Sequence, residues 1–336
     1  MMTAVRYTLT HIASQLLHRW LPPPLISEVE SADEQLDASM ILGLEERDWL
    51  RLIHADQCRN EPALAWFSRY QKYIDRDGLL LARTTHQHLR ALTTAGGTYV
   101  PLCDPRYPIA LRQINDPPMA LSVCGDLQGF ALPAVSVVGS RKASALAMHA
   151  SFDLGRCLAS KGFLVVSGGA FGCDIAAHHG VLASHLYPAP AACIFAGGLA
   201  TLYPRANEPV FQRLRAQKAL LISERLWTAT CRPVDFMARN RIISGLGAIT
   251  VLMQAATRSG ALVTARLALD QGRDVAVMQH PVGDVRANGS AALLYEGAWG
   301  FDNAEDFLDG WRGRCFGSTT TASASQDPQQ DSLHEG

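Results

Sequence analysis

Two stretches carry the clearest signal of the architecture: AVSVVGSRK at residues 134–142 and FLVVSGGAFG at residues 163–172. In each, a short valine-rich run passes into a turn that contains glycine and serine. Such runs are typical of strands buried on both faces of a sheet, since a strand with one face in water alternates apolar and polar residues. A helical pattern follows each turn. Strand, turn and helix in this order predict an α/β fold with a parallel sheet.

The same pattern recurs from Ala134 onward. Candidate strands occupy residues 135–138, 163–166, 193–196, 219–222, 249–253 and 274–278. We therefore predict a doubly wound, extended Rossmann-like and mostly parallel sheet with helices on both faces. Sheets of this kind bind ligands at the carboxyl ends of their strands, so the turns after the strands form the candidate site.

The chain divides into three unequal parts. Residues 1–95 contain short apolar-periodic stretches between polar or proline-rich breaks, which predict a small helical domain of the SAM-like or helix-hairpin-helix-like kind. Residues 96–312 hold the predicted extended Rossmann-like domain. Residues 313–336 are rich in serine, threonine and glutamine and lack apolar periodicity, so we predict a disordered tail there.

The composition favours a globular protein. Hydrophobic residues make up 48% and charged residues 18% of the 336 residues. No apolar run reaches the roughly 18 residues that a membrane span needs, so we predict no membrane association and a cytoplasmic protein. The 30 basic residues are balanced by 31 acidic ones, which means that a nucleic acid would have to be held by locally placed arginine and lysine. Eight cysteines without a C-x-x-C pair argue against a zinc ribbon or a disulfide scaffold.

The first two turns offer groups that bind anions. GSRK at residues 139–142 precedes a helix, and the first backbone N–H groups of a helix attract negative charge. SGGAFG at residues 167–172 lets backbone amides approach a phosphate, because glycine has no side chain. Amides, hydroxyls and a guanidinium suit phosphate oxygens better than a sugar or an apolar substrate.

The run Arg239-Asn240-Arg241 lies among mostly apolar residues, so at least one guanidinium is expected to be held against the fold. A buried arginine needs an anionic or hydrogen-bonding partner. That partner is either a phosphate of the ligand or a carboxylate of the protein, such as Asp235 or Glu224.

When the Arg239-Asn240-Arg241 run is counted as a third turn, a fourth follows the fifth candidate strand. It again opens a helix with a basic residue in front. It contains Arg258, Ser259 and Gly260. Four turns at one edge of the sheet, three of them with arginine, predict a single anion-binding cleft.

Known enzyme signatures are missing from these turns. A dehydrogenase would show G-x-G-x-x-G after the first strand, whereas residues 139–144 are GSRKAS. No G-x-x-x-x-G-K-[ST] loop occurs, and neither Ser167 nor Ser259 stands in the G-x-S-x-G of a serine hydrolase. We predict neither an enzymatic activity nor a cofactor.

A metal site is an alternative for one cluster. Asp174 and His178 are four residues apart on one helix face, with Cys173 and His179 beside them. A helix-capping aspartate that packs against a histidine explains the same spacing, and further ligands are not identified. We therefore predict no metal.

The ordered motifs resemble the DprA/Smf family of DNA-processing proteins. The resemblance covers roughly residues 98–300 and is most specific in the Arg-Asn-Arg run and the Ser-Gly turns. The matching positions are Gly139-Ser140-Arg141, Ser167-Gly168-Gly169-Ala170 with Gly172 and Asp174, Ala177-His178, Gly197-Gly198-Leu199 with Tyr203-Pro204, Ser223-Glu224, Arg239-Asn240-Arg241-Ile242-Ile243, and Ser259-Gly260 with Thr264-Ala265.

The resemblance implies a homodimer that binds and protects incoming single-stranded DNA and loads the RecA recombinase onto it during natural transformation. Such a protein grips successive phosphates with cationic and amide donors and makes no covalent bond. The residues that the resemblance places against DNA phosphates are Ser140, Arg141, Lys142, Ser167, Gly168, Gly169, Phe171, Arg239, Asn240, Arg241, Arg258, Ser259 and Gly260.

The chain also departs from the family pattern. Phe171 stands where a basic residue is usual, and it is expected to offer a stacking face instead. Gln254 stands where an acid is usual. The winged-helix domain that many members carry is expected to be missing after Phe316. These features predict a specialised relative.

A rival interpretation is a Rossmann-like protein that senses or hydrolyses nucleotide-derived ligands in a similar pocket. The related hydrolases show a P-G-G-x-G-T turn with a catalytic glutamate, and no such turn occurs in this sequence. Nucleotide sensing without catalysis stays open.

Overall fold

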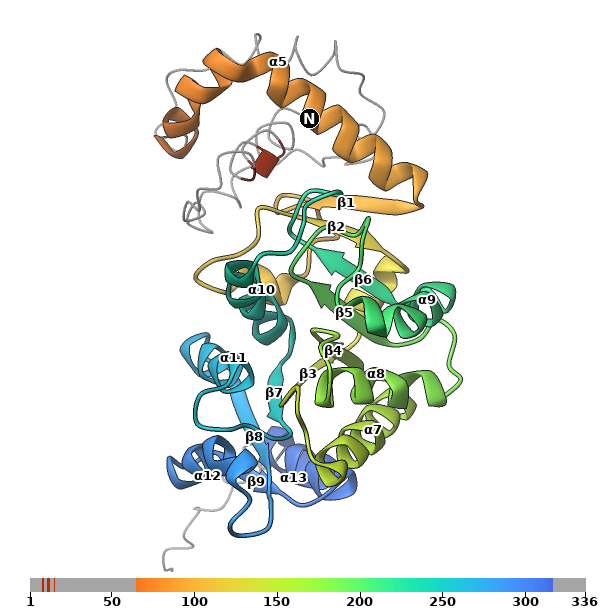
Figure 1. Cartoon of the computed structure of the whole chain (residues 1–336), viewed down its shortest axis with the longest axis vertical. Helices are drawn as coiled ribbons and strands as arrows, with labels where there is room; N and C mark the ends of the chain where they lie inside the picture. Colours follow the sequence, from red (N-terminus) through yellow and green to blue (C-terminus); the bar gives the residue numbers. More distant parts are fainter. Residues whose placement is uncertain (1–7, 9–10, 13–14, 16–64, 317–336) are drawn as a thin grey trace, which may run out of the picture.

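The computed structural model describes residues 8, 11, 12, 15 and 65–316, with side chains described from 78 to 311 in the longer segment (Figure 1). Within these residues one sheet has the strand order β1-β2-β6-β5-β4-β3-β7-β8-β9. Strands β3 to β9 run parallel, whereas β1 and β2 join one edge antiparallel. The strands are β1 (Gly97–Pro101), β2 (Ala120–Cys124), β3 (Ala134–Val138), β4 (Leu164–Ser167), β5 (Ala191–Phe195), β6 (Leu220–Ser223), β7 (Ile249–Leu252), β8 (Asp274–Met278) and β9 (Trp299–Phe301).

A helix follows each parallel strand, as the sequence pattern predicts. The helices are α5 (Ala65–Thr94), α6 (Ile109–Arg112), α7 (Ala145–Ser160), α8 (Cys173–Ala183), α9 (Glu208–Ala216), α10 (Pro233–Leu246), α11 (Gly260–Asp270), α12 (Asn288–Tyr295) and α13 (Ala304–Phe316). Short 3₁₀ turns lie at η2 (Leu127–Ala131), η3 (Arg205–Asn207) and η4 (Val285–Ala287).

The doubly wound, mostly parallel fold is confirmed, and the six candidate strands correspond to β3 through β8. Strands β1, β2 and β9, which lie toward the two edges of the sheet, were not among the predicted strands. The predicted helical domain of residues 1–95 falls outside the described residues apart from α5 and the single residues named above, and the predicted tail falls outside them apart from the end of α13. Both remain predictions.

Helices cover both faces of the sheet. On one face α7, α8, α9 and α13 pack over a core cluster that includes Leu154, Ile175, Phe211 and Phe307. On the other face α6, α10 and α11 pack over a second cluster that includes Leu111, Ile243 and Leu262. Figure 1 shows these two groups of helices on opposite sides of the strands. Because the strands are covered on both sides, their sequences are almost continuously apolar.

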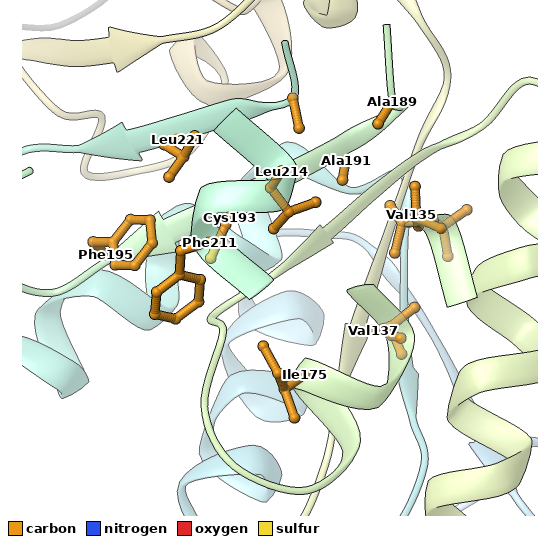
Figure 2. Close-up of a cluster of buried hydrophobic side chains, with 14 of the residues drawn as sticks. Val135, Val137, Ile175, Ala189, Ala191, Cys193, Phe195, Phe211, Leu214 and Leu221 are labelled. Atoms are coloured by element: carbon orange, nitrogen blue, oxygen red, sulfur yellow. The ribbon is translucent and has the colours of Figure 1, made fainter. Parts of the chain in front are cut away.

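The first cluster is densely packed beneath the β4–α8 turn (Figure 2). Val137 of β3 and Cys193 of β5 point toward Ile175 of α8 and Phe211 of α9. The ring of Phe211 meets the ring of Phe195 edge to face, with centroids 5.0 Å apart. This packing gives the carboxyl ends of the strands a rigid base.

Two glycines bring α7 and α8 into backbone contact. A Cβ atom at Gly155 would lie 2.2 Å from the carbonyl oxygen of Ala177, and one at Gly180 would lie 2.0 Å from that of Phe152. Only glycine fits such a close approach. The first two predicted turns open α7 and α8, so this contact holds the two turns side by side.

His178 of α8 is fully buried, and neither ring nitrogen has a hydrogen-bond partner. Burial, together with a smaller contribution from the nearby His179, lowers the pKa of His178 to about 4. The folded protein therefore keeps this histidine neutral at pH values where the unfolded chain takes up a proton.

We expect stability to fall in mild acid partly through this residue. The contribution is fully present above the unfolded pKa of about 6.5 and is lost at up to about 1.4 kcal/mol per pH unit as the pH falls toward the folded value. Denaturant unfolding of His178→Leu between pH 7 and pH 4.5 should show a shallower pH dependence than the parent. His149→Leu, at an exposed site on α7, is the control, and equal slopes for parent and His178→Leu would contradict this assignment.

Candidate functional site

The sheet reverses its direction of growth between β3 and β7. From β3 the chain adds β4, β5 and β6 on one side, and from β7 it adds β8 and β9 on the other. The connections after β3 and β7 diverge at this point, and open α/β sheets bind their ligands in the crevice that results. The first, second and fourth predicted turns lie at this carboxyl edge, whereas the Arg239-Asn240-Arg241 run, counted as the third, is not a turn but part of helix α10, which packs against the edge.

Hydrogen bonds link the three turns and helix α10. The amide of Ser140 donates to the carbonyl oxygen of Gln254 over 2.7 Å, and the amide of Cys173 donates to the carbonyl oxygen of Ser140 over 3.3 Å. Arg239 and Asn240 of α10 contact Gly168 in the second turn and Gly260 in the fourth. Their side chains donate to those carbonyl oxygens over 2.9 Å and 3.5 Å. The three turns thus meet at one edge of the sheet, with α10 in place of the predicted third turn.

The first turn presents its cations to solvent. Arg141 and Lys142 are both exposed. Ser140 Oγ accepts a hydrogen bond from the amide of Lys142 over 3.1 Å and shapes the turn. Ser144 then caps α7 by accepting from the amide of Ala147 over 3.1 Å.

The second turn uses its polar groups internally. Ser167 Oγ donates to the carbonyl oxygen of Val137 over 2.7 Å, so its proton is engaged. The amides of Gly168 and Ala170 donate to Oδ2 of Asp174 over 3.2 and 3.4 Å. The amides expected to cradle a phosphate thus hold a carboxylate of the protein. Sequence reasoning favoured a helix-capping role for Asp174 but did not predict that its carboxylate accepts from the amides of the second turn.

Glycine at position 168 leaves room for the guanidinium of Arg239. A Cβ atom there would lie 2.5 Å from Nη1 of Arg239, and one at Gly169 would lie 2.8 Å from the ring of Phe211. The backbone of this turn is therefore pressed against the guanidinium on one side and against the apolar core on the other.

Arg239 lies beneath the turns and is 6% exposed. Its Nη1 donates to the carbonyl oxygens of Gly168 and Ile194, at the ends of β4 and β5. Burial lowers the pKa of Arg239, and the carboxylate of Asp174 opposes that shift. Burial likewise raises the pKa of Asp174, and the charge of Arg239 opposes it. The two opposite charges therefore favour each other inside the protein, although they do not form a direct ion pair.

Arg241 is held by carboxylates. Its guanidinium bonds to Glu224 through Nη2 over 2.6 Å and to Asp116 through Nε over 2.6 Å, and its side chain is 8% exposed. Burial works against the charge, yet Glu224 and Asp116 raise the pKa of Arg241 overall. Of the two kinds of partner open from the sequence, a protein carboxylate holds this arginine, and a phosphate could bind it only by displacing that carboxylate.

The fourth turn resembles the first. Arg258 is exposed. Ser259 caps α11 by accepting from the amide of Leu262 over 3.2 Å. The carbonyl oxygen of Gly260 accepts from Asn240 and from Thr264. In the part of the chain with described side chains, the surface cations at this edge therefore include Arg141, Lys142 and Arg258.

The cluster considered for a metal is arranged differently. Asp174 faces backbone amides, and His178 is enclosed by the core. Across the described residues, no three side chains of histidine, cysteine, aspartate or glutamate are grouped so that they could hold a metal ion. In the same residues no helix is long and apolar enough to cross a membrane.

Comparison with known proteins gives consistent matches. The family model of DNA recombination-mediator protein A matches residues 98–312. The chain is 32% identical to DNA processing protein DprA of Bacillus subtilis over 66% of this chain and 73% of that protein. It is 34% identical to protein Smf of Escherichia coli over 60% of this chain and 54% of that protein. The match thus spans only about half the length of the second relative.

Solved structures agree. DNA processing protein A of Streptococcus pneumoniae superposes with a TM-score of 0.65 at 27% identity, over 90% of this chain and 95% of that chain. DNA processing protein A of Helicobacter pylori, for which a single-stranded DNA binding mode is described, gives 0.58 at 29% identity, over 64% of this chain and 96% of that chain.

Asp174 predicts a stability defect that separates framework from surface. Asp174→Asn keeps the shape of the side chain but removes the carboxylate that accepts from the amides of Gly168 and Ala170 and that favours the charge of Arg239, so we expect a loss of about 1–3 kcal/mol in unfolding free energy. Denaturant titration measures it. Asp153→Asn, whose carboxylate pairs at the surface of α7, should lose at most about 1 kcal/mol. Similar losses in the two variants would refute the proposed framework role.

Proposed function

Because the chain belongs to the DNA recombination-mediator protein A family, we propose that it binds single-stranded DNA by its phosphates at the carboxyl edge of the sheet. Family membership supports the proposal, and so does the single-stranded DNA binding described for the Helicobacter pylori protein. The proposed binding is non-covalent and needs neither an enzymatic step nor a cofactor.

One structural observation carries the proposal. Arg141, Lys142 and Arg258 stand exposed on turns that contact one another through Ser140 and Gln254. Among the described residues, none of the three cations forms an ion pair with a carboxylate. Cations without acidic partners on neighbouring turns suit a ligand that carries several negative charges in a row.

The buried residues of the predicted site support this surface from below. Arg239 holds the second turn, whose backbone Asp174 also orders, and Arg241 anchors α10 to Glu224 at the end of β6. In the proposed binding mode the phosphates meet the exposed cations first. Ser259 and Gly260 add the N-terminus of α11 beside Arg258, where a helix start favours an anion.

We further propose that the protein protects incoming single-stranded DNA in the cytoplasm, loads RecA onto it during natural transformation, and acts as a homodimer. The description of the family as recombination mediators supports the RecA step. The relatives named above as DNA processing proteins support the transformation role by kinship.

Removal of one exposed cation should weaken DNA binding and leave the fold unchanged. For Arg141→Ala we expect a loss of about 1–3 kcal/mol in binding to oligo-dT, since a charge-assisted phosphate contact is lost. The slope of log affinity against log salt should decrease by about 0.7. Fluorescence anisotropy with a labelled oligo-dT at two or more salt concentrations measures both quantities.

The matched control is Arg213→Ala, an exposed arginine in the last turn of α9, toward the opposite edge of the sheet. It should keep the parent's affinity and salt slope. An unchanged affinity for Arg141→Ala would remove the first turn from the interface. If a mononucleotide binds tightly in calorimetry while the oligomer binds weakly, nucleotide sensing replaces DNA binding as the function.

RecA loading has its own test. On single-stranded DNA coated with a single-strand binding protein, addition of this protein should shorten the lag of RecA filament formation, measured by the DNA-dependent ATPase of RecA. Arg141→Ala should shorten the lag less than the parent, because loading requires the loader on the DNA. An unchanged lag with a DNA-binding parent protein would reject RecA loading and leave DNA binding intact.

A further inference from the structure

Aromatic side chains lie near the exposed arginine of the first turn. The guanidinium carbon of Arg141 lies 5.0 Å from the centre of the Phe236 ring, within the range of a cation–π contact. The ring of Tyr203 meets the same Phe236 ring edge to face, with centroids 5.8 Å apart and planes at 63°. Three separate segments therefore meet here: the β3–α7 turn, the β5–α9 connection and the start of α10.

Phe171 belongs to the same neighbourhood. A Cβ atom at the next residue, Gly172, would lie 2.0 Å from the carbonyl oxygen of Ser140, so the turn that carries Phe171 is pressed against the first turn. On its other side, Asn207 Nδ2 donates to the carbonyl oxygen of Gly169 over 3.0 Å. Phe171 thus stands on a turn held by the segment that supplies Arg141 and by the segment that supplies Tyr203.

The rings differ in exposure. Phe236 is half-buried and supports the other side chains, whereas Tyr203 is 51% and Phe171 is 43% exposed. Large aromatic rings gain free energy when they are covered, and flat exposed rings accept another flat ring most readily. The proposed function places a phosphate of single-stranded DNA at Arg141. The flat ring expected beside it is therefore a base of the same strand.

We propose that Tyr203 and Phe171, supported by Phe236, form a stacking surface for the unpaired bases of the single-stranded DNA whose phosphates Arg141 contacts. The inference rests on the proposed function and adds a base-dependent contribution to it. In single-stranded nucleic acid each phosphate is followed by a base that has a flat face, and proteins that bind such strands combine cations with stacking rings. The alternation of cation and exposed ring at this edge matches that chemistry.

A polymer without bases separates stacking from phosphate binding. We would compare labelled oligo-dT with an abasic sugar-phosphate oligomer of the same length and charge, by anisotropy at fixed salt. The parent protein should bind oligo-dT more tightly. Tyr203→Ala should lose about tenfold in affinity for oligo-dT, as expected for one lost stacking contact. Its affinity for the abasic oligomer and its salt slope should not change, because no charge is removed. Phe171→Ala should behave alike.

Two control variants make the result specific. Tyr203→Phe keeps the ring and should keep the affinity for oligo-dT. Tyr187→Ala removes another exposed tyrosine that is followed by proline, from the α8–β5 connection at the opposite edge, and should bind both polymers as the parent does.

The outcomes distinguish the two proposals. If the parent binds both polymers equally, or Tyr203→Ala weakens both by the same factor, the stacking surface is wrong and phosphate binding stands. If the parent binds neither polymer, the proposed function itself fails and the stacking surface fails with it.

Discussion

Two buried side chains of opposite charge, Arg239 and Asp174, fix the turn between β4 and α8. The guanidinium donates to the carbonyl oxygens of Gly168 and Ile194, and the carboxylate accepts from the amides of Gly168 and Ala170. Both the donor and the acceptor of Gly168 are therefore engaged with side chains, which fixes the path of the chain between β4 and α8. Burial disfavours each charge and the opposite charge nearby favours it, so each side chain helps to keep the other ionised.

The arginines at this edge therefore fall into a buried group and an exposed group. Arg239 and Arg241 are committed to carbonyl oxygens and carboxylates of the framework, whereas Arg141 and Arg258 stand outside on the turns that the framework positions. The chain has a formal net charge of −1, yet it presents cations at this edge, because acidic residues such as Glu224 are paired inside it. Local placement and not bulk charge makes the edge suitable for a polyanion.

The sheet and the meeting of the turns could be predicted from the sequence, but the partner of each hydrogen-bond donor could not. Strands buried on both faces have an unmistakable apolar pattern, which identified β3 through β8, whereas β9 has three residues and is too short to show one. Parallel strands share an edge, so convergence of their turns followed. The amide of Gly168 points at a carboxylate six residues later. For the arginine run the sequence left a ligand phosphate, Asp235 and Glu224 open as partners, and the structure selects Glu224 for Arg241. Such partners depend on how α8 and α10 are seated, which no local pattern records.

Two of the departures from the family pattern, Gln254 and Phe171, lie at this same edge. Gln254 accepts from the amide of Ser144 over 2.9 Å while its own amide donates to Asp284 over 2.9 Å. An acid there would keep the first bond but face the carboxylate of Asp284, and like charges at that distance repel. Phe171 replaces a charge with a ring. A phosphate contact weakens as counterions compete, whereas stacking carries no charge. If the stacking surface binds bases as proposed, a phenylalanine in place of a basic residue makes part of the binding free energy for DNA less sensitive to salt.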